Sequence, residues 1–291
     1  LTASAIVICM PLRIYSETLT AYQFFTLVVG IYFLYVLMLA LKNDRSTLLL
    51  SLVIPFYNES SCIDGVCSEL HQVLSENSDT IPTWECILVD DGSQDRTGQM
   101  IEDWAARRGQ FRAVHITPNS GQSAALQAGF QVARGLYIGT MDGDGQNDPR
   151  DLPLLLGELQ RRNVDMMCGI RARRADSVIR KASSRIANGV RRTILRDGIT
   201  DVGCAIRVLR RDCLAHVPFF RNAHRFFPAL VMAAGFRVAE TPVRHRPRLK
   251  GTSKYGAGIN NRLWVGLADL AGVYWLRRRA LPYHISETMK E

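Results

Sequence analysis

From residue 48 onward, short apolar runs alternate with longer stretches that have helical spacing. The first run, Leu48–Pro55, is typical of a strand that is covered on both faces. The expected strands after it are Glu85–Val89, Phe111–Ile116 and Gly135 to about Asp142, and the expected helices are Ser61–Ser75, one from Asp95, and Ser120–Arg134. Strands that alternate with helices over short connections predict an α/β fold with a mostly parallel sheet and flanking helices.

Polar residues follow each of the four expected strands at the point where the strand ends. These groups are Pro55–Glu59, Asp90–Ser93, Asn119–Gln122 and Asp142–Gln146. One such group alone is ordinary turn chemistry. Open α/β sheets, however, bind their ligands beyond the carboxyl ends of the strands, so four groups at one rim predict a binding site. The sequence has no G-x-G-x-x-G and no G-x-x-x-x-G-K-[ST] motif, which argues against a dinucleotide or P-loop site.

The most acidic of these groups continues as DGDGQNDP from residue 142 to 149. Asp142 and Asp144 supply carboxylates two residues apart, and Gln146 supplies an amide oxygen two residues later. Such hard oxygen ligands suit Mg²⁺ or Mn²⁺. Either ion would keep coordination positions open for phosphate oxygens. The twelve-residue spacing of a calcium loop is absent. The stretch therefore predicts a metal site formed by Asp142, Asp144 and Gln146 that holds a diphosphate.

Charge is divided unevenly along the chain. Residues 1–150 contain 9 Lys and Arg against 16 Asp and Glu, whereas residues 151–291 contain 27 against 11. The first half thus has a net charge of −7 and the second a net charge of +16. This division predicts a cation site in the first half and an anionic partner for the second. A basic, non-catalytic module for nucleic acid or anionic membrane is an alternative, but no basic-aromatic nucleic-acid motif supports it, and we expect no nucleic-acid partner.

Six motifs, in order along the chain, resemble glycosyltransferase family 2, and the last two resemble its polyprenyl-phosphate branch, the dolichol-phosphate mannose synthase-like enzymes. They are P-x-Y-N-E (55–59), V-D-D-G-S-x-D-x-T (89–97), N-x-G-x-x-x-A-L-x-A-G-F (119–130), D-x-D-x-Q (142–146), D-x-G-C-x-x-R-V-x-R-R (201–211) and H-R-P-R-x-x-G-x-S-K-Y-G (245–256). The similarity covers about residues 48–280. It implies a GT-A fold, a Rossmann-like sheet, in an enzyme that passes a hexose from a UDP- or GDP-sugar to a polyprenyl phosphate, with undecaprenyl phosphate expected.

The resemblance also implies roles for individual residues. The nucleotide would be held by Pro55, Tyr57, Glu59, Asp90 and Asp91. The metal, and through it the diphosphate, would be held by Asp142, Asp144 and Gln146. The acceptor and its phosphate would be bound by Arg171, Arg180, Ser184, Arg207, Arg248, Ser253 and Lys254. Catalysis would rest on Asp142, Asp144, Arg207 and Lys254, with Lys254 in a glycine-flanked loop that closes over the phosphates.

A phosphate acceptor is already anionic, so attack on the sugar needs fixed cations rather than a strong base. We expect one in-line displacement that inverts the anomeric carbon. A family 2 enzyme acting on a hydroxyl of lipopolysaccharide or a surface glycan is the nearer alternative. It would need a carboxylate base, and the region expected to supply one, His224–Leu230, contains none.

Two apolar segments predict membrane contact. Phe24–Leu41 is 18 residues without a charge, and as a helix of about 27 Å it could span a bilayer, although a buried core helix is the alternative. Lys42 and Arg45 follow it, which places the rest of the chain on the cytoplasmic side of a bacterial inner membrane. Leu263–Leu276, at 14 residues, is too short to span and suits a helix in the membrane interface or one packed on the core.

These segments divide the chain into three expected parts. Residues 1–45 form a membrane anchor with a transmembrane helix, residues 46–258 form the catalytic domain, and residues 259–291 form an interfacial amphipathic helix and tail. The partners that follow from this organisation are a nucleoside-diphosphate sugar, a polyprenyl phosphate lipid and the membrane itself.

Overall fold

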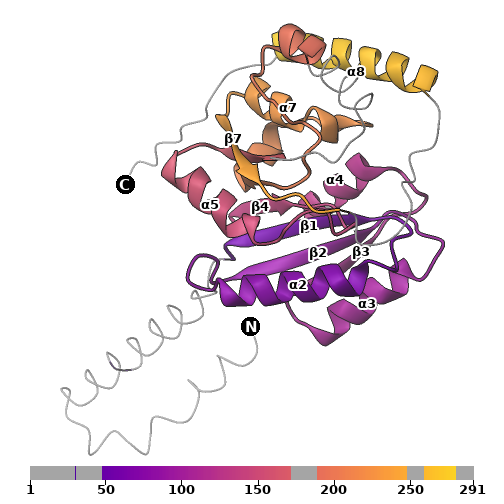
Figure 1. Cartoon of the computed structure of the whole chain (residues 1–291), viewed down its shortest axis with the longest axis vertical. Helices are drawn as coiled ribbons and strands as arrows, with labels where there is room; N and C mark the ends of the chain where they lie inside the picture. Colours follow the sequence, from indigo (N-terminus) through magenta and orange to yellow (C-terminus); the bar gives the residue numbers. More distant parts are fainter. Residues whose placement is uncertain (1–29, 31–47, 172–188, 248–258, 280–291) are drawn as a thin grey trace, which may run out of the picture. The chain divides into compact units, whose positions relative to one another are not determined.

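The computed structural model describes residue 30 and residues 48–171, 189–247 and 259–279. Its strands form one seven-stranded sheet in the order β3-β2-β1-β4-β6-β5-β7 (Figure 1). The strands are β1 Leu50–Phe56, β2 Trp84–Asp90, β3 Phe111–His115, β4 Tyr137–Thr140, β5 Met166–Arg171, β6 Arg207–Arg210 and β7 Val238–Val243. Only β6 among them runs antiparallel to its neighbours, β4 and β5. The predicted α/β fold with a mostly parallel sheet is confirmed.

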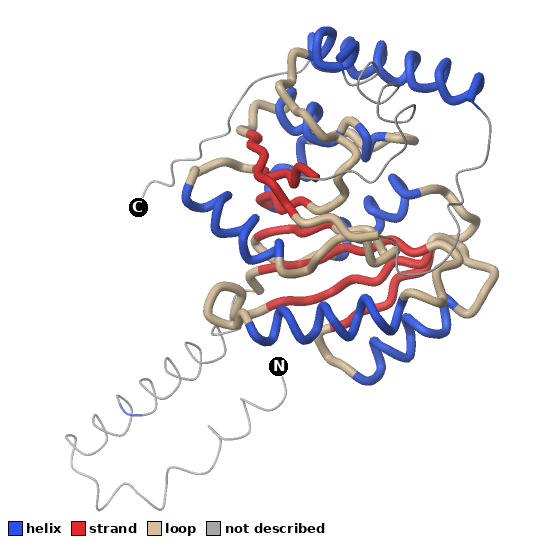
Figure 2. Tube along the Cα trace, in the orientation of Figure 1, coloured by secondary structure: helices blue, strands red, loops and turns tan. Residues whose placement is uncertain are grey.

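Helices cover both faces of this sheet, as the tube in Figure 2 shows. They are α2 Ile63–Glu76, α3 Thr97–Arg107, α4 Gln122–Val132, α5 Asp151–Arg161, α7 Phe227–Ala233 and α8 Ile259–Arg279, with short 3-10 turns η1 Arg211–His216 and η2 Ala223–Arg225. Helices α2, α3 and α5 contribute to one apolar cluster, and α4, α7 and α8 contribute to the other. The sheet is therefore buried on both sides, which explains the apolar strand sequences.

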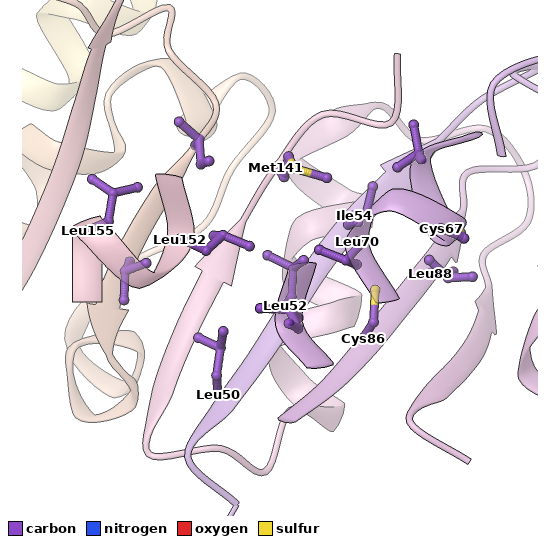
Figure 3. Packing of buried hydrophobic residues seen from close by; sticks show 14 of the residues in the cluster. Leu50, Leu52, Ile54, Cys67, Leu70, Cys86, Leu88, Met141, Leu152 and Leu155 are labelled. Carbon is purple, nitrogen blue, oxygen red and sulfur yellow. The ribbon is translucent and has the colours of Figure 1, made fainter. Parts of the chain in front are cut away.

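Alternation along β1 divides its side chains between the two clusters. Leu50, Leu52 and Ile54 face α2 and α5, whereas Val53 faces α4. Figure 3 shows the first of these clusters, with Leu152 and Leu155 of α5 beside the strand residues. Because successive strand residues point to opposite faces, this alternation fixes the register of the central strand and the position of its polar carboxyl end.

The predicted elements lie close to the observed ones. The expected strand Leu48–Pro55 is β1, Leu50–Phe56, and the expected helix Ser61–Ser75 is α2, Ile63–Glu76. The fourth strand ends at Thr140 rather than near Asp142. The Met141 N–H still donates to the Val53 carbonyl oxygen of β1 at 3.3 Å, and the chain after it forms the loop that carries the acidic motif.

The two apolar segments have different outcomes. Phe24–Leu41 lies outside the described residues, apart from Gly30. Within the part of the chain that the structure describes, no helix is both long and apolar enough to cross a membrane. Leu263–Leu276 lies within α8, and the buried Leu270 and Val273 join the apolar cluster that includes α7. Helix α8 is therefore packed on the domain along one face.

Candidate active site

The polar groups at the strand ends meet in one pocket of about 330 Å³. It is lined by Pro55, Phe56, Tyr57, Glu59, Asp91, Asn119, Gly121, Gln122, Asp142, Gly143 and Asp144. Six residues predicted for the nucleotide and metal are in this set: Pro55, Tyr57, Glu59, Asp91, Asp142 and Asp144. Every one of the four polar groups contributes, as expected for the carboxyl ends of neighbouring parallel strands.

The loops after β1 and β2 are joined by hydrogen bonds between motif residues. The Asn58 N–H donates to Ser93 Oγ at 2.9 Å, and the Gln94 N–H donates to Asn58 Oδ1 at 2.7 Å. The Glu59 N–H donates to Thr97 Oγ1 at 2.9 Å. These bonds hold Tyr57 and Glu59 at the pocket wall, and they explain why serine and threonine recur in the motif after β2.

Two adjacent carboxylates after β2 have different surroundings. Asp91 lines the pocket and accepts hydrogen bonds from the Ser120 N–H at 2.8 Å and the Gly121 N–H at 2.9 Å. Burial raises the pKa of Asp91, and these bonds oppose the rise. Asp90 does not line the pocket, and its carboxylate accepts a bond from the Ser93 N–H at 3.0 Å. Asp90 thus shapes the loop, while Asp91 fixes the start of α4.

Glycine is required at two positions of the rim. Gly92 has φ of +68°, and a Cβ there would lie 2.7 Å from the Asn119 backbone nitrogen. At Gly143, between the two metal-site carboxylates, a Cβ would lie 2.5 Å from the Phe56 ring. Side chains at these positions would separate the strand ends, so the glycines permit the close approach that forms the pocket.

Asp142 and Asp144 form the acidic centre of the pocket. Gln122 Nε2 donates to Asp142 Oδ1 at 2.8 Å, and the Gln146 N–H donates to Asp144 Oδ1 at 3.0 Å. Burial and the nearby Asp144 raise the pKa of Asp142 to about 6, although Arg207 and Arg171 oppose this rise. Two carboxylates that destabilise each other's charge suit a bound cation.

The residues present fit a hard divalent ion whose other ligands come from outside the protein. Within the described ranges, no group of three or more His, Cys, Asp or Glu side chains is arranged to hold a metal. Asp142 and Asp144 therefore supply two carboxylates of an incomplete set, as in sites that Mg²⁺ completes with phosphate oxygens and water. Gln146 does not line the pocket, and its Nε2 lies 3.5 Å from the Arg246 carbonyl oxygen.

The third carboxylate of the acidic stretch, Asp148, is not part of the pocket. It is buried and forms ion pairs with Arg246, Arg150 and Arg244. Burial would raise the pKa of Asp148, but the Arg246 guanidinium and the bonds from Arg150 hold it below its ordinary value. Arg246 also donates to both Glu69 oxygens, at 2.8 and 2.9 Å. This cluster attaches the metal loop to α2 and to the segment after β7.

A second pocket of about 230 Å³ adjoins the first, because Gln122 and Asp142 line both. Its other lining residues are Leu126, Thr140, Met141, Val202, Gly203, Cys204, Ala205, Arg207, His224 and Arg225. The His224 Nδ1 lies 2.8 Å from Ser123 Oγ. Burial, followed by the charges of Arg225 and Arg207, lowers the pKa of His224 to about 3, so the imidazole is neutral.

The predicted phosphate-binding arginines that the structure describes are engaged with the protein itself. Arg207 donates to the carbonyl oxygens of Cys204, His224 and Val202 at 3.0, 3.1 and 2.8 Å. Arg171 forms a two-pronged ion pair with Asp201 at 2.8 and 2.7 Å. The other residues predicted for the acceptor lie outside the described residues: Arg180, Ser184, Arg248, Ser253 and Lys254.

The structure places at the site several residues whose roles the sequence motifs do not indicate. Gln122 and Asn119 belong to a motif that was noted, but their bonds to Asp142 and Asp91 depend on how the loops fold. Arg225 lies in the segment His224–Leu230, which was considered only for its lack of a carboxylate. The sequence signal for Arg225 is its place beside His224 in the positively charged half of the chain, residues 151–291.

Comparisons with known proteins agree with this geometry. The profile of Glycosyl transferase family 2 matches residues 51–217. The dodecaprenyl-phosphate galacturonate synthase of Rhizobium johnstonii is 37% identical over 247 residues, which is 83% of this chain and 72% of that protein. The undecaprenyl-phosphate 4-deoxy-4-formamido-L-arabinose transferase of Edwardsiella ictaluri is 34% identical over 74% of this chain and 66% of its own length. The match thus spans about two thirds to three quarters of these relatives.

Solved structures support the fold. Glucosyl-3-phosphoglycerate synthase from Mycobacterium tuberculosis, in complex with Mn²⁺, UDP and its product, has a TM-score of 0.57 and 16% identity over 81% of this chain and 82% of that one. The same enzyme with Mg²⁺ and UDP also has a TM-score of 0.57. These neighbours bind a divalent ion and UDP, and their likeness confirms the GT-A fold. The chain is a glycosyltransferase and belongs to glycosyltransferase family 2, in the branch of the polyprenyl-phosphate enzymes.

Proposed function

We propose that this enzyme transfers a hexose from a nucleoside-diphosphate sugar to a polyprenyl phosphate, with undecaprenyl phosphate as the acceptor. The second pocket carries this proposal. A hydroxyl acceptor needs a general base, but among the described residues that line this pocket Asp142 is the only carboxylate, and it is assigned to the metal. His224, with a pKa of about 3, is a poor base. Two arginines line the pocket instead, which suits an acceptor that is already ionised.

The first pocket is assigned to the donor. Pro55, Tyr57 and Glu59 would contact the base and ribose, and Asp142 and Asp144 would hold Mg²⁺ or Mn²⁺ against the diphosphate. Gln146 lies outside the pocket lining, and in this proposal its amide oxygen joins the metal site from there. Asp90 and Asp91 would support the nucleotide side through the loops that they fix. Because the solved neighbours bind UDP, a UDP-sugar is favoured over a GDP-sugar. One relative is named for galacturonate, a hexose derivative, and the others for a formamido-arabinose, which is a pentose derivative. Since the proposed sugar is a hexose, we propose a uronic acid such as galacturonate as the first donor to test.

The proposed reaction is a single displacement. An acceptor phosphate oxygen forms a bond to the anomeric carbon while the bond from that carbon to the diphosphate breaks, and the electron pair leaves with the nucleoside diphosphate. The acceptor gives up no proton, since its oxygen is already anionic. Attack opposite the leaving group inverts the anomeric carbon. A divalent cation, when bound, stabilises the charge that develops on the leaving diphosphate.

The donor and the metal requirement can be tested together. Purified full-length enzyme is given radiolabelled UDP- and GDP-sugars with undecaprenyl phosphate, with Mg²⁺ or with EDTA. We expect label to enter the organic phase from a UDP-sugar and to be lost with EDTA. Donor hydrolysis without lipid label would remove the proposed acceptor, and a product that keeps the donor's anomeric configuration would contradict the displacement.

We further propose that the enzyme works at the cytoplasmic face of a bacterial inner membrane. In this proposal residues 1–45 anchor the chain, residues 46–258 catalyse, and residues 259–291 lie at the interface. Helix α8 supports the last part, because Trp264 and Trp275 are 70% and 59% exposed on the side away from Leu270 and Val273. Arg277, Arg278 and Arg279 follow in its last turn, where they would meet anionic headgroups.

Quenching of tryptophan fluorescence by brominated phospholipids tests this placement in the reconstituted full chain. The protein contains four tryptophans, and the other two, Trp84 and Trp104, pack with Phe111 at the far side of the sheet. We expect strong quenching that disappears in W264F/W275F and persists in W84F/W104F. Equal quenching in both variants would contradict a bilayer contact of α8 and would favour another protein segment as its partner.

A further inference from the structure

The second pocket borders the first at Asp142, one of the two metal-site carboxylates. Gln122 and Asp142 form the wall that it shares with the first pocket. A sugar whose diphosphate is held at Asp142 would lie beside the second pocket, because Asp142 lines both pockets. Charged groups on the lining of the second pocket would then lie near that sugar and its acceptor.

The two arginines that line this pocket are used differently. Arg207 is only 5% exposed, and its guanidinium donates to three backbone carbonyl oxygens. Arg225 is exposed, and its guanidinium forms no hydrogen bond or ion pair with any residue that the structure describes. Arg207 thus builds the pocket, whereas Arg225 has its donors available for a ligand.

The backbone that carries Arg225 is held in place from several directions. The His224 N–H donates to Ser123 Oγ at 3.2 Å, and the His224 carbonyl oxygen accepts from Arg207 at 3.1 Å. Two residues before His224, Asn222 Nδ2 donates to Asp269 of α8 at 3.0 Å. Such anchoring places the base of the Arg225 side chain at the pocket before any ligand binds, which lowers the entropic cost of binding.

The charge around the pocket favours an anion. Of the lining residues that the structure describes, Asp142 is the only acidic one, and the proposed metal would neutralise it. His224 is neutral, since burial and the fields of Arg225 and Arg207 lower its pKa to about 3. A partly enclosed cavity with two guanidinium groups and no free carboxylate concentrates negatively charged ligands.

We propose that Arg225 is a substrate-binding residue whose guanidinium holds an anionic oxygen group, a phosphate or a carboxylate, at the second pocket. The planar fork of arginine matches both groups with two parallel hydrogen bonds. The proposal rests on the proposed function, which offers two sources of this chemistry. One is the phosphate of the polyprenyl acceptor, and the other is the carboxylate of a uronic acid donor.

The test compares full-length wild type with Arg225→Gln and Arg225→Lys. The matched control is Arg221→Gln. Arg221 is an exposed arginine four residues before Arg225, and it lines neither pocket. Titration calorimetry with Mn²⁺ present measures binding of farnesyl phosphate against farnesol, and of UDP-galacturonate against UDP-galactose. Sugar transfer to farnesyl phosphate is measured for the same four proteins.

In Arg225→Gln we expect affinity for one anionic probe to fall about ten- to a hundredfold, the range for a lost charged hydrogen bond. Arg225→Lys should recover part of this affinity, and Arg221→Gln should bind the probe as tightly as wild type. Loss confined to farnesyl phosphate identifies the acceptor phosphate, and loss confined to UDP-galacturonate identifies a sugar carboxylate. The proposal is overturned if Arg225→Gln binds every probe within twofold of wild type, or if wild type binds neither anion. Wild type that binds the anion but transfers no sugar would instead refute the proposed function.

Discussion

The two pockets share Asp142 and Gln122, yet they are built in different ways. The first is formed by residues that directly follow parallel strands, each within a short motif of the acidic half. The second is assembled from β4, α4, the loop before β6 and η2, which are far apart in the sequence. The comparison teaches that a motif at a strand end indicates where a side chain lies. A basic composition indicates that a surface carries positive charge, but it does not indicate which arginines are available to a ligand.

The largest expected effect is on sugar transfer, when one of the proposed metal-binding carboxylates of the first pocket is replaced. Asp144→Asn should lower transfer about a hundredfold or more, because it removes a ligand from a metal that offsets the charge of the leaving group. Mn²⁺ titration should show a matching loss of metal affinity, while the melting temperature changes little. A variant with normal metal affinity and near-normal turnover would break the assignment of the first pocket.

Arg207 is expected to act mainly on stability. Arg207→Met keeps the length of the side chain but leaves three carbonyl oxygens without their donor, which should cost about 2–4 kcal/mol of unfolding free energy. Urea denaturation measures this loss. Mn²⁺-dependent UDP binding should be nearly retained, and an unchanged denaturation curve would show that Arg207 does not hold the wall of the second pocket.

Arg246 should show a smaller stability effect than Arg207. Arg246→Gln leaves the buried Asp148 carboxylate with weaker partners, and we expect a loss of about 1–3 kcal/mol, since Arg246 is partly exposed. Asp148→Asn in the same chain should restore part of this loss, which a double-mutant cycle measures. Strictly additive losses would show that the two side chains are not coupled and that Asp148 has another role.

The smallest expected effect concerns pH. The folded pKa of His224 is about 3, whereas an unfolded histidine titrates near ~6.5. Below ~6.5 the unfolded chain binds a proton that the folded chain does not, so the stability linked to His224 is complete above this pH and falls as the pH drops toward 3. When the pH is lowered from 7 to 5, the unfolding free energy of wild type should therefore fall by about 1–2 kcal/mol more than that of His224→Asn. Parallel stability curves would contradict a buried neutral imidazole.

Much of the first pocket could be predicted because its signals are local. A strand that ends in P-x-Y-N-E or in D-x-D presents these side chains at a known edge of the sheet, whatever the details of packing. The acidic stretch also contains Asp148, for which the strand-end pattern predicts no role. Its ion pairs with Arg246, Arg150 and Arg244 depend on the path of the chain after β7, about a hundred residues away.

The second pocket could not be predicted in the same way. The family resemblance implies a phosphate-binding role for Arg171 and Arg207, but their hydrogen bonds go to Asp201 and to backbone carbonyls, and no local pattern reveals this. Arg225 carries no such bonds, and it lies in none of the six motifs. For α8, the apolar sequence correctly indicated a helix, and its packing on the core along one face is confirmed. The opposite face exposes Trp264 and Trp275, and its contact with the membrane interface stays a prediction.

The central claim is that the second pocket receives a phosphate and not a hydroxyl. The most direct measurement offers the purified enzyme undecaprenyl phosphate and undecaprenol in parallel, with the same labelled UDP-sugar and Mn²⁺. We predict label in the lipid only with the phosphate, in a product whose ³¹P spectrum shows a sugar phosphodiester of inverted anomeric configuration. Equal transfer to undecaprenol, or to a glycan hydroxyl in place of the lipid phosphate, would contradict the account.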